Sequence, residues 1–340
     1  MNTLTQTEIC SLLAFPDEVE VPTPAEPVTG LKNAPYFQPV DIRLHTLGVE
    51  TLSIDGITVT ATQQRYEEQV QIVECHFKLP DPLSLESIQR RQKLEEELQE
   101  RFIPTNYRAS GLFEVYTVLL VKDNLDVPDE FVEANRPTLA RFIRSQREVL
   151  DETEIDDILV SRLHYSKDDL TLVDWEAALI FAPEGDFQSD IELLKIGNYQ
   201  LLRYRLLDQS VEELLKAINR AFQQSKFSVF GPTRVTLRRI ITHRLEIMLE
   251  FEHTEQNLLL IGDWYTAKLY KIICDEFYLD DWKQVVQSKL DNLESLISTI
   301  QENFSMTWSG FLDLVQLVGW LVLLVGYFIL FFLEDLKLSP

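Results

Sequence analysis

An uncharged apolar run near the C-terminus constrains this chain more than any other feature. Leu314–Leu333 reads LVQLVGWLVLLVGYFILFFL, and Gln316 is its only strongly polar residue. About 20 such residues in a helix span a hydrocarbon core of about 30 Å. Core helices of globular proteins are rarely apolar on every face over this length. The sequence therefore predicts a transmembrane helix over residues 310–334 and a short tail over residues 335–340.

A single membrane span predicts a single-pass membrane protein. Met1–Leu13 contains Glu8, lacks a basic segment and has no long apolar stretch, so it does not resemble a secretory signal. We expect contact with the lipid bilayer through residues 314–333 and a soluble domain in the cytoplasm, the layout of a tail-anchored protein. Gly319 and Gly326 are seven positions apart and would share a face suited to close helix packing.

Charge and cysteine content exclude some classes of partner. The chain has 340 residues, 45% of them hydrophobic, which is enough for a packed core, and a net charge of -24. An acidic surface repels phosphate backbones, so we expect no nucleic-acid partner. Cys10, Cys75 and Cys274 lie far apart and predict neither a disulfide framework nor a zinc site.

The N-terminal half predicts a mixed α/β domain behind a flexible lead-in. Residues 1–40 are predicted to be flexible, since their second half is dense in proline, which fixes φ and removes backbone donors. Over residues 41–185, β-type and helical segments alternate. Asp55-Gly56 favours a tight hairpin turn, and Val70–Leu79 alternates as a half-buried strand does.

The following residues, 187–305, predict a long helical, coiled-coil-like region. Apolar residues at helical spacing cover Asp190–Gln224, with a bend at Gly197, and two further stretches up to Asn303. Helices of this length need a partner helix along their apolar face, which predicts an antiparallel helical hairpin or an intermolecular coiled coil. The expected fold class is α+β: a mixed α/β domain, then a long antiparallel helical hairpin, then one C-terminal transmembrane helix.

No known catalytic motif is present. Phosphate-binding glycine loops, a serine-hydrolase elbow and a zinc-protease histidine pair are all missing from the sequence. Cys75 and His76 are adjacent, which places their side chains on opposite faces of a strand, so they cannot share a metal ion. The sequence therefore predicts no catalytic residues, no cofactor and no metal site.

Two blocks of the C-terminal half carry a resemblance to known families. The blocks are Ile191–Asp208, IELLKIGNYQLLRYRLLD, and Glu255–Leu290, with an N-x-L-x-x-G-D-x-Y-x-A-x-x-Y segment. From Thr171 onward the chain resembles a family of uncharacterised bacterial membrane proteins. Its C-terminal half is also similar to the required-for-meiotic-nuclear-division family, whose members are membrane-anchored and often mitochondrial. The resemblance implies structural or interface roles, rather than catalysis, for Asn257, Gly262, Asp263, Tyr265, Tyr270 and Trp282.

These observations together predict a membrane-anchored, non-enzymatic scaffold or interaction protein. The helical region would serve as a stalk for a homo-oligomer or for binding a protein partner. One alternative is an oligomeric ion-transport component with the layout of CorA-type magnesium channels, although the Gly-Met-Asn pore motif and a second span are missing. Another alternative is an enzyme at the membrane surface with an unrecognised site.

Overall fold

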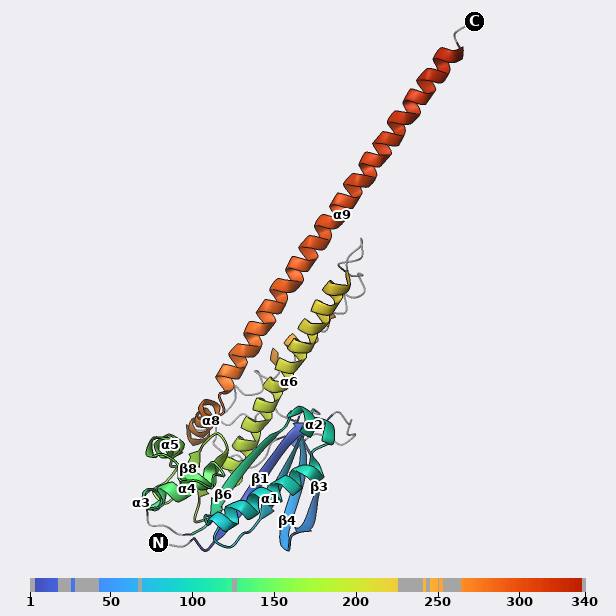
Figure 1. Ribbon diagram of the computed structural model, residues 1–340. Coiled ribbons are helices and arrows are strands. Elements are labelled where there is room, and N and C mark those ends of the chain that lie inside the picture. The colour runs from blue at the N-terminus through green and yellow to red at the C-terminus, as the bar shows by residue number, and fades with distance from the viewer. Residues whose placement is uncertain are drawn as a thin grey trace. The chain divides into compact units, whose positions relative to one another are not determined.

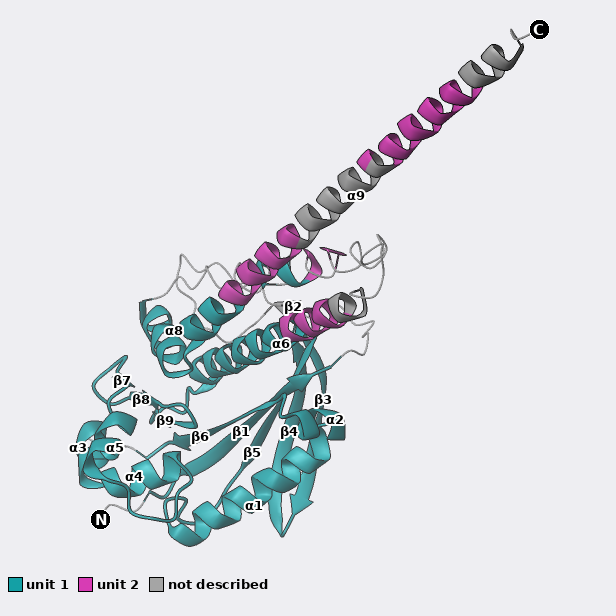
Figure 2. Ribbon diagram, turned by 45° about the horizontal axis from the view of Figure 1, so that its top comes forward, with its two compact units in different colours: residues 1–210, 247–286 teal, residues 211–246, 287–340 magenta. Residues whose placement is uncertain are grey.

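The computed structural model describes most of the chain in two units. The described residues are 4–17, 26–27, 43–66, 69–123, 127–225, 241–242, 245–249, 251–252 and 264–337. The first unit, called the sheet unit, comprises Met1–Ser210 and Ile247–Val286. The second, called the helical unit, comprises Val211–Glu246 and Gln287–Pro340 (Figure 2).

One mixed sheet forms the centre of the sheet unit. Among the described residues it has nine strands in the order β2-β3-β4-β5-β1-β6-β9-β8-β7. Neighbouring strands are antiparallel except β6 and β9, which are parallel. The strands are β1 Thr7–Pro16, β2 Glu26–Pro27, β3 Arg43–Ile54, β4 Ile57–Tyr66, β5 Val70–Phe77, β6 Glu114–Val121, β7 Arg162–Leu163, β8 Leu170–Val173 and β9 Ala177–Phe181.

The N-terminal strand β1 lies in the middle of this sheet, between β5 and β6 (Figure 1). Its core residues Ile9 to Phe15 are at most 2% exposed. The prediction of a flexible segment over residues 1–40 was therefore wrong for Thr7–Pro16. Both faces of a central strand are covered, so β1 is a nearly continuous apolar run and does not alternate.

The predicted hairpin at Asp55-Gly56 is confirmed. β3 and β4 pair in register from Ile54↔Ile57 outward. Asp55 and Gly56 both have positive φ, 47° and 75°, as a two-residue turn of this type requires. Glycine adopts this conformation without a steric cost, and aspartate is one of the few other residues that tolerates it.

Helices cover both faces of the sheet (Figure 2). On one face, α1 packs with three short helices against Val73, Cys75 and Phe77 of β5. The side chain of Ser84 caps the start of α1 by accepting a hydrogen bond from the Ser87 backbone N–H. The helices on this side of the sheet unit are α1 Leu85–Phe102, α2 Thr105–Ser110, α3 Pro128–Ala134, α4 Arg136–Ile143 and α5 Glu152–Ile158.

The opposite face carries α6, Gln188–Ser225, and α8, Trp264–Glu276. The predicted bend at Gly197 does not occur, since α6 continues through it. A Cβ at Gly197 would lie 2.5 Å from Cγ2 of Ile273 and 3.1 Å from Cε2 of Phe277. Glycine is therefore needed here because α8 and its C-terminal end approach the α6 backbone closely.

The predicted antiparallel helical hairpin stays a prediction, because most of its second helical stretch lies outside the described residues. α9, Leu279–Lys337, runs in the same direction as α6 (Figure 1). Lys289 of α9 forms an ion pair with Glu212 of α6 at 3.1 Å, so the two helices are neighbours in this unit. Most of the chain between α6 and α8 lies outside the described residues.

The structure does not support the predicted transmembrane helix. In the described part of the chain, no helix is both long enough and apolar enough to cross a membrane. The side chains of residues 314 and 330–333 lie outside the described set. The predictions of a helix spanning the membrane over residues 310–334 and of a single-pass location are thus not supported, and the fold is α+β without that helix.

Candidate metal centre

Three potential metal ligands meet on the face of the sheet that α6 covers. Strand pairing places Cys10 of β1 directly beside His76 of β5, and Leu12 beside Glu74. Glu74 and His76 are two residues apart and therefore point to the same face. One ligand atom from each of Cys10, Glu74 and His76 lies within 4.8 Å of the other two. Cys10 and Glu74 are buried, and His76 is half-buried.

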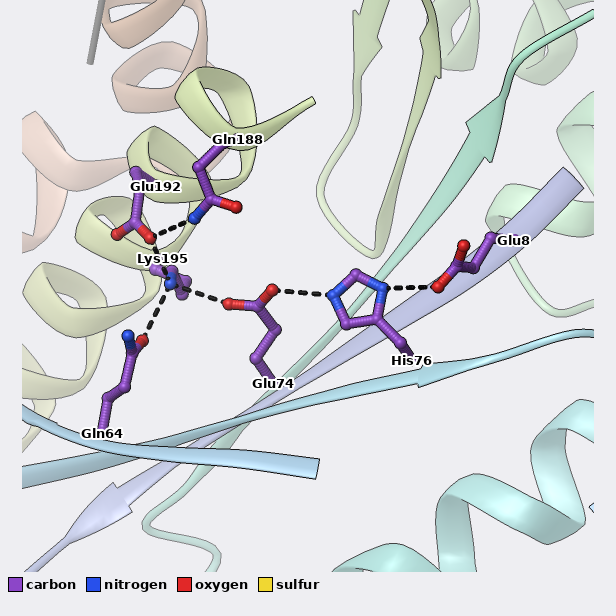
Figure 3. Close-up of polar contacts among 7 residues, drawn as sticks. All are labelled: Glu8, Gln64, Glu74, His76, Gln188, Glu192 and Lys195. Atoms are coloured by element: carbon purple, nitrogen blue, oxygen red, sulfur yellow. Dashed lines mark hydrogen bonds and ion pairs between the residues drawn. The ribbon is translucent and has the colours of Figure 1, made fainter. Parts of the chain in front are cut away.

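Two of these ligands, His76 and Glu74, have outer polar partners (Figure 3). Nδ1 of His76 lies 3.0 Å from Oε1 of Glu8, and its Nε2 lies 2.7 Å from Oε1 of Glu74. The other carboxylate oxygen of Glu74 accepts a hydrogen bond of 2.8 Å from Nζ of Lys195. Metal-binding histidines usually place their second ring nitrogen against such a carboxylate, which fixes the ring orientation.

Lys195 joins this cluster to α6. Its side chain is 0% exposed and donates to Glu74, to Oε1 of Glu192 at 2.5 Å and to Oε1 of Gln64 at 2.9 Å. Glu192 in turn accepts a hydrogen bond from Gln188, at 2.7 Å, and one from Tyr66, at 3.2 Å. The cation is thus fully satisfied in a buried setting, which is the condition under which a buried charge is tolerated.

Burial and pairing shift the pKa values of the cluster in opposite directions. Burial raises the pKa of the Cys10 thiol above its usual range. Burial alone would lower the pKa of His76, but hydrogen bonds to Cys10, Glu74 and Glu8 outweigh it and raise the pKa to about 12. Burial likewise opposes ionisation of Glu74, yet His76 and Lys195 lower its pKa to about 2. The metal-free cluster is therefore a thiol beside an imidazolium held between two carboxylates.

A cleft of about 430 Å³ opens next to this cluster. Glu8 and His76 belong to its wall, together with residues from the β3–β4 turn, β4, the end of β5 and α1. The full lining is Glu8, Gly56, Ile57, Thr58, Thr60, His76, Phe77, Lys78, Pro80 and Arg90. One candidate ligand, His76, is thus accessible from solvent.

Three of the interface residues named from the sequence lie in the sheet unit. Tyr265 is buried and its hydroxyl donates to Asp190 at 3.0 Å, which joins α8 to the start of α6. Tyr270, also on α8, donates to Oε1 of Gln200 on α6. Trp282 is half-buried near the start of α9. The two tyrosines therefore connect α8 to α6 and do not belong to the metal cluster.

Of the other five named residues, two lie within the described part of the chain. Asn257, Gly262 and Asp263 lie outside the described residues. Gly319 and Gly326 on α9 have no atom within 4 Å of an added Cβ among the described neighbours. The predicted close helix packing at these two glycines is therefore not seen.

Sequence reasoning missed the metal cluster because its members are far apart in the chain. The inference that Cys75 and His76 point to opposite faces is confirmed, since Cys75 belongs to the core beneath α1. The cysteine beside His76 comes from another strand, and residues 1–40 were predicted to have no strand. The only local sign of the site in the sequence was the spacing of Glu74 and His76, which places a carboxylate and an imidazole on the same face of one strand.

Comparison with known proteins connects this chain to an archaeal protein. Residues 27–188, just under half of the chain, match a family model described as "Uncharacterized protein MJ0711, N-terminal domain". The protein of that name from Methanocaldococcus jannaschii is 26% identical over 215 residues, which cover 63% of this chain and 66% of the relative. The chain thus spans slightly less than two thirds of that relative. No solved structure matches this chain.

These matches correct the resemblance drawn from the sequence. The relative is archaeal, and the matched family model is of an archaeal type, so assignment to a bacterial membrane-protein family was wrong. Glu74 and His76 lie inside the matched segment, whereas Glu8, Cys10 and Lys195 lie outside it.

Proposed function

We propose that this protein binds a divalent transition-metal ion of the zinc class at Cys10, Glu74 and His76. The observation that carries the proposal is the convergence of a thiol, a carboxylate and an imidazole within 4.8 Å. A thiolate and a carboxylate together supply two negative charges, which match a divalent cation. Sulfur and imidazole ligands favour zinc and its neighbours over calcium and magnesium, which prefer oxygen.

To accept such an ion, the site needs small side-chain rotations and the release of two protons, one from the Cys10 thiol and one from the His76 imidazolium. Bonds of about 2.0 Å to nitrogen or oxygen and about 2.3 Å to sulfur place the ligands of a tetrahedral zinc ion roughly 3 to 4 Å apart. The contact of 2.7 Å between His76 and Glu74 would have to open slightly. Glu8 and Lys195 would stay as outer partners of His76 and Glu74, as they are without the ion.

Three protein ligands leave a fourth position for water or a small molecule, the arrangement typical of zinc sites that bind or convert a ligand. Because His76 also belongs to the wall of the cleft, an ion bound to it would lie near a space open to solvent. The proposal is therefore a metal-dependent ligand-binding protein.

Metal analysis of the purified full-length protein tests this proposal. Cobalt added to the metal-free protein should give one ion per chain and a thiolate-to-cobalt absorption band. Cys10→Ser should abolish the band, and metal affinity should fall by more than the about 10–100-fold typical of losing an outer partner. Cys75→Ser is the matched control, because Cys75 is buried on the opposite face. An unchanged band in Cys10→Ser, or no stoichiometric binding, would rule the site out.

A different observation favours a second function, self-association. Val315–Ile329 of α9 carries many large apolar side chains that are more than half exposed, among them Leu321 at 59% and Leu324 at 56%. Apolar patches of this extent on a protein surface mark interaction sites. We propose a second copy of this chain as the partner, because it offers an identical apolar helix of equal length.

Light scattering after size-exclusion chromatography tests self-association. The full-length chain should have the mass of an oligomer, and Leu321→Gln with Leu324→Gln should shift it toward the monomer. Val160→Gln, at a residue that is 70% exposed in the sheet unit, should leave the mass unchanged. A monomeric full-length chain would rule this function out.

A further inference from the structure

The cleft beside the metal cluster has the composition of an anion site. Its lining includes two cationic residues, Lys78 and Arg90, and two residues with hydroxyl groups, Thr58 and Thr60. We propose that this cleft binds a small molecule that bears a phosphate group. The inference goes beyond the metal proposal, because Lys78 and Arg90 are not metal ligands.

The two cations are available to a ligand. Among the described residues, neither Lys78 nor Arg90 is part of an ion pair. Arg90 donates one hydrogen bond of 3.1 Å to the backbone oxygen of Asp55, which uses one of its five N–H groups and holds it at the cleft. Most other cations of the sheet unit have a carboxylate partner, as Lys93 has in Asp55 at 2.7 Å. Lys78 lies near enough to the Glu8 carboxylate to help lower the pKa of that group, but the two form no ion pair.

The directions from which the donors come favour a phosphate over a carboxylate. Thr58 and Thr60 are alternate residues of β4 and present their hydroxyls on one face of the sheet. Lys78 follows β5, and Arg90 comes from α1. A phosphate has three or four oxygens that point in different directions, whereas a carboxylate has two in one plane. Arginine and lysine are also the usual phosphate ligands.

The rest of the lining accommodates the organic part of such a ligand. Ile57, Phe77 and Pro80 supply an apolar wall. A volume of about 430 Å³ falls within the about 300–1,000 Å³ typical of small-molecule sites and exceeds what a phosphate ion fills. Glu8 is the one acidic residue of the lining, and its carboxylate is held by His76 at 3.0 Å. The geometry therefore points to an organic phosphate monoester.

Calorimetric titration of the full-length protein tests the inference with three probes: phenyl phosphate, inorganic phosphate and benzoate. We expect saturable binding of phenyl phosphate, weaker binding of inorganic phosphate and no binding of benzoate. Lys78→Gln and Arg90→Gln should each weaken phenyl phosphate binding by about tenfold or more, as expected for a lost charged hydrogen bond. Lys167→Gln is the control, because it removes the same charge from a side chain that is 89% exposed outside the cleft.

Three outcomes would overturn the inference. Absence of saturable binding would exclude the site, and equal loss in Lys167→Gln would reduce it to a general charge effect. Tighter binding of benzoate than of phenyl phosphate would exclude the ligand class. Titration of Cys10→Ser separates this inference from the metal proposal. Retained phosphate binding there, without cobalt binding, leaves the cleft valid whatever the role of the metal cluster.

Discussion

At the scale of single residues, Lys195 contributes most to the polar cluster. Its ammonium group lies between the buried carboxylates of Glu74 and Glu192. Replacing a buried ion pair completely can be nearly neutral, whereas removing one partner leaves a charge without compensation. A substitution of Lys195 therefore tests whether these buried side chains form one network or make contacts that do not depend on one another.

Lys195→Met should lower the free energy of unfolding by about 3–5 kcal/mol, as measured by urea denaturation. Adding Glu74→Gln and Glu192→Gln should recover part of the loss, since no unpaired charge then remains. Lys93→Met, which breaks an exposed ion pair with Asp55, should cost much less, because solvent screens an exposed pair. A loss below about 1 kcal/mol for Lys195→Met would contradict the network.

Asp174, at the turn between β8 and β9, predicts a pH dependence of stability. Its side chain is 3% exposed and lies 3.2 Å from Arg144. Burial raises its pKa to about 6, although Arg144 opposes the shift. The unfolded value is about 3.9, so the folded state binds more protons between these values. The stabilisation that the protonated Asp174 carboxyl gives the folded state is complete below about pH 4. It is lost as the pH rises through about 6.

Asp174→Asn should remove that dependence. From pH 4 to pH 7, the free energy of unfolding of the wild type should fall relative to that of the variant by about 2 kcal/mol. Urea denaturation of both proteins at several pH values measures the difference. A difference that does not change with pH would show that Asp174 ionises normally in the folded protein.

At the scale of elements, the close approach of α6 and α8 depends on one glycine. Gly197→Ala should lower the free energy of unfolding by about 1–3 kcal/mol, because the new Cβ would meet Ile273 at 2.5 Å. This loss is expected although alanine favours an isolated helix by about 1 kcal/mol. A thermal or urea melt gives the value.

A second glycine in a helix supplies the control. Gly319 in α9 has no atom within 4 Å of an added Cβ among its described neighbours, so Gly319→Ala should not destabilise the protein. In a double-mutant cycle with Ile273→Ala, the cost of Gly197→Ala should shrink, since Cγ2 is then gone. Equal costs in both backgrounds would show that the contact is not strained.

Sequence patterns predicted those elements whose signals are local. The turn at Asp55-Gly56, the strand from Val70 and the helix α6 were all predicted from nearby residues. β1 was missed because a strand covered on both faces has no alternation, and the prolines that follow it suggested a mobile segment. The metal cluster was missed with it, since pairing of Cys10 with His76 is a property of strand order, which periodicity does not encode.

At the scale of the whole molecule, the exposed apolar side chains over Val315–Ile329 of α9 belong to the helical unit. A chain that ends after Thr299 lacks Val315–Ile329 but keeps every described residue of the sheet unit. Its free energy of unfolding, followed by urea denaturation, should stay within about 0.5 kcal/mol of the full-length value. Its tendency to aggregate should fall, because the apolar patch is gone. A loss of more than about 1 kcal/mol would show that residues 300–340 stabilise the sheet unit.

The central position of β1 also has a consequence for biosynthesis. This strand leaves the ribosome before both of its partners, since Cys10 pairs with His76 of β5 on one side and Val118 of β6 on the other. Closing such long loops costs chain entropy, and contacts between distant residues form late in folding. The ligand set cannot assemble until β5 has been made and joined to β1. A metal ion that binds only the assembled set would stabilise the finished sheet by mass action, and would thereby act as a late checkpoint in the maturation of a newly made chain.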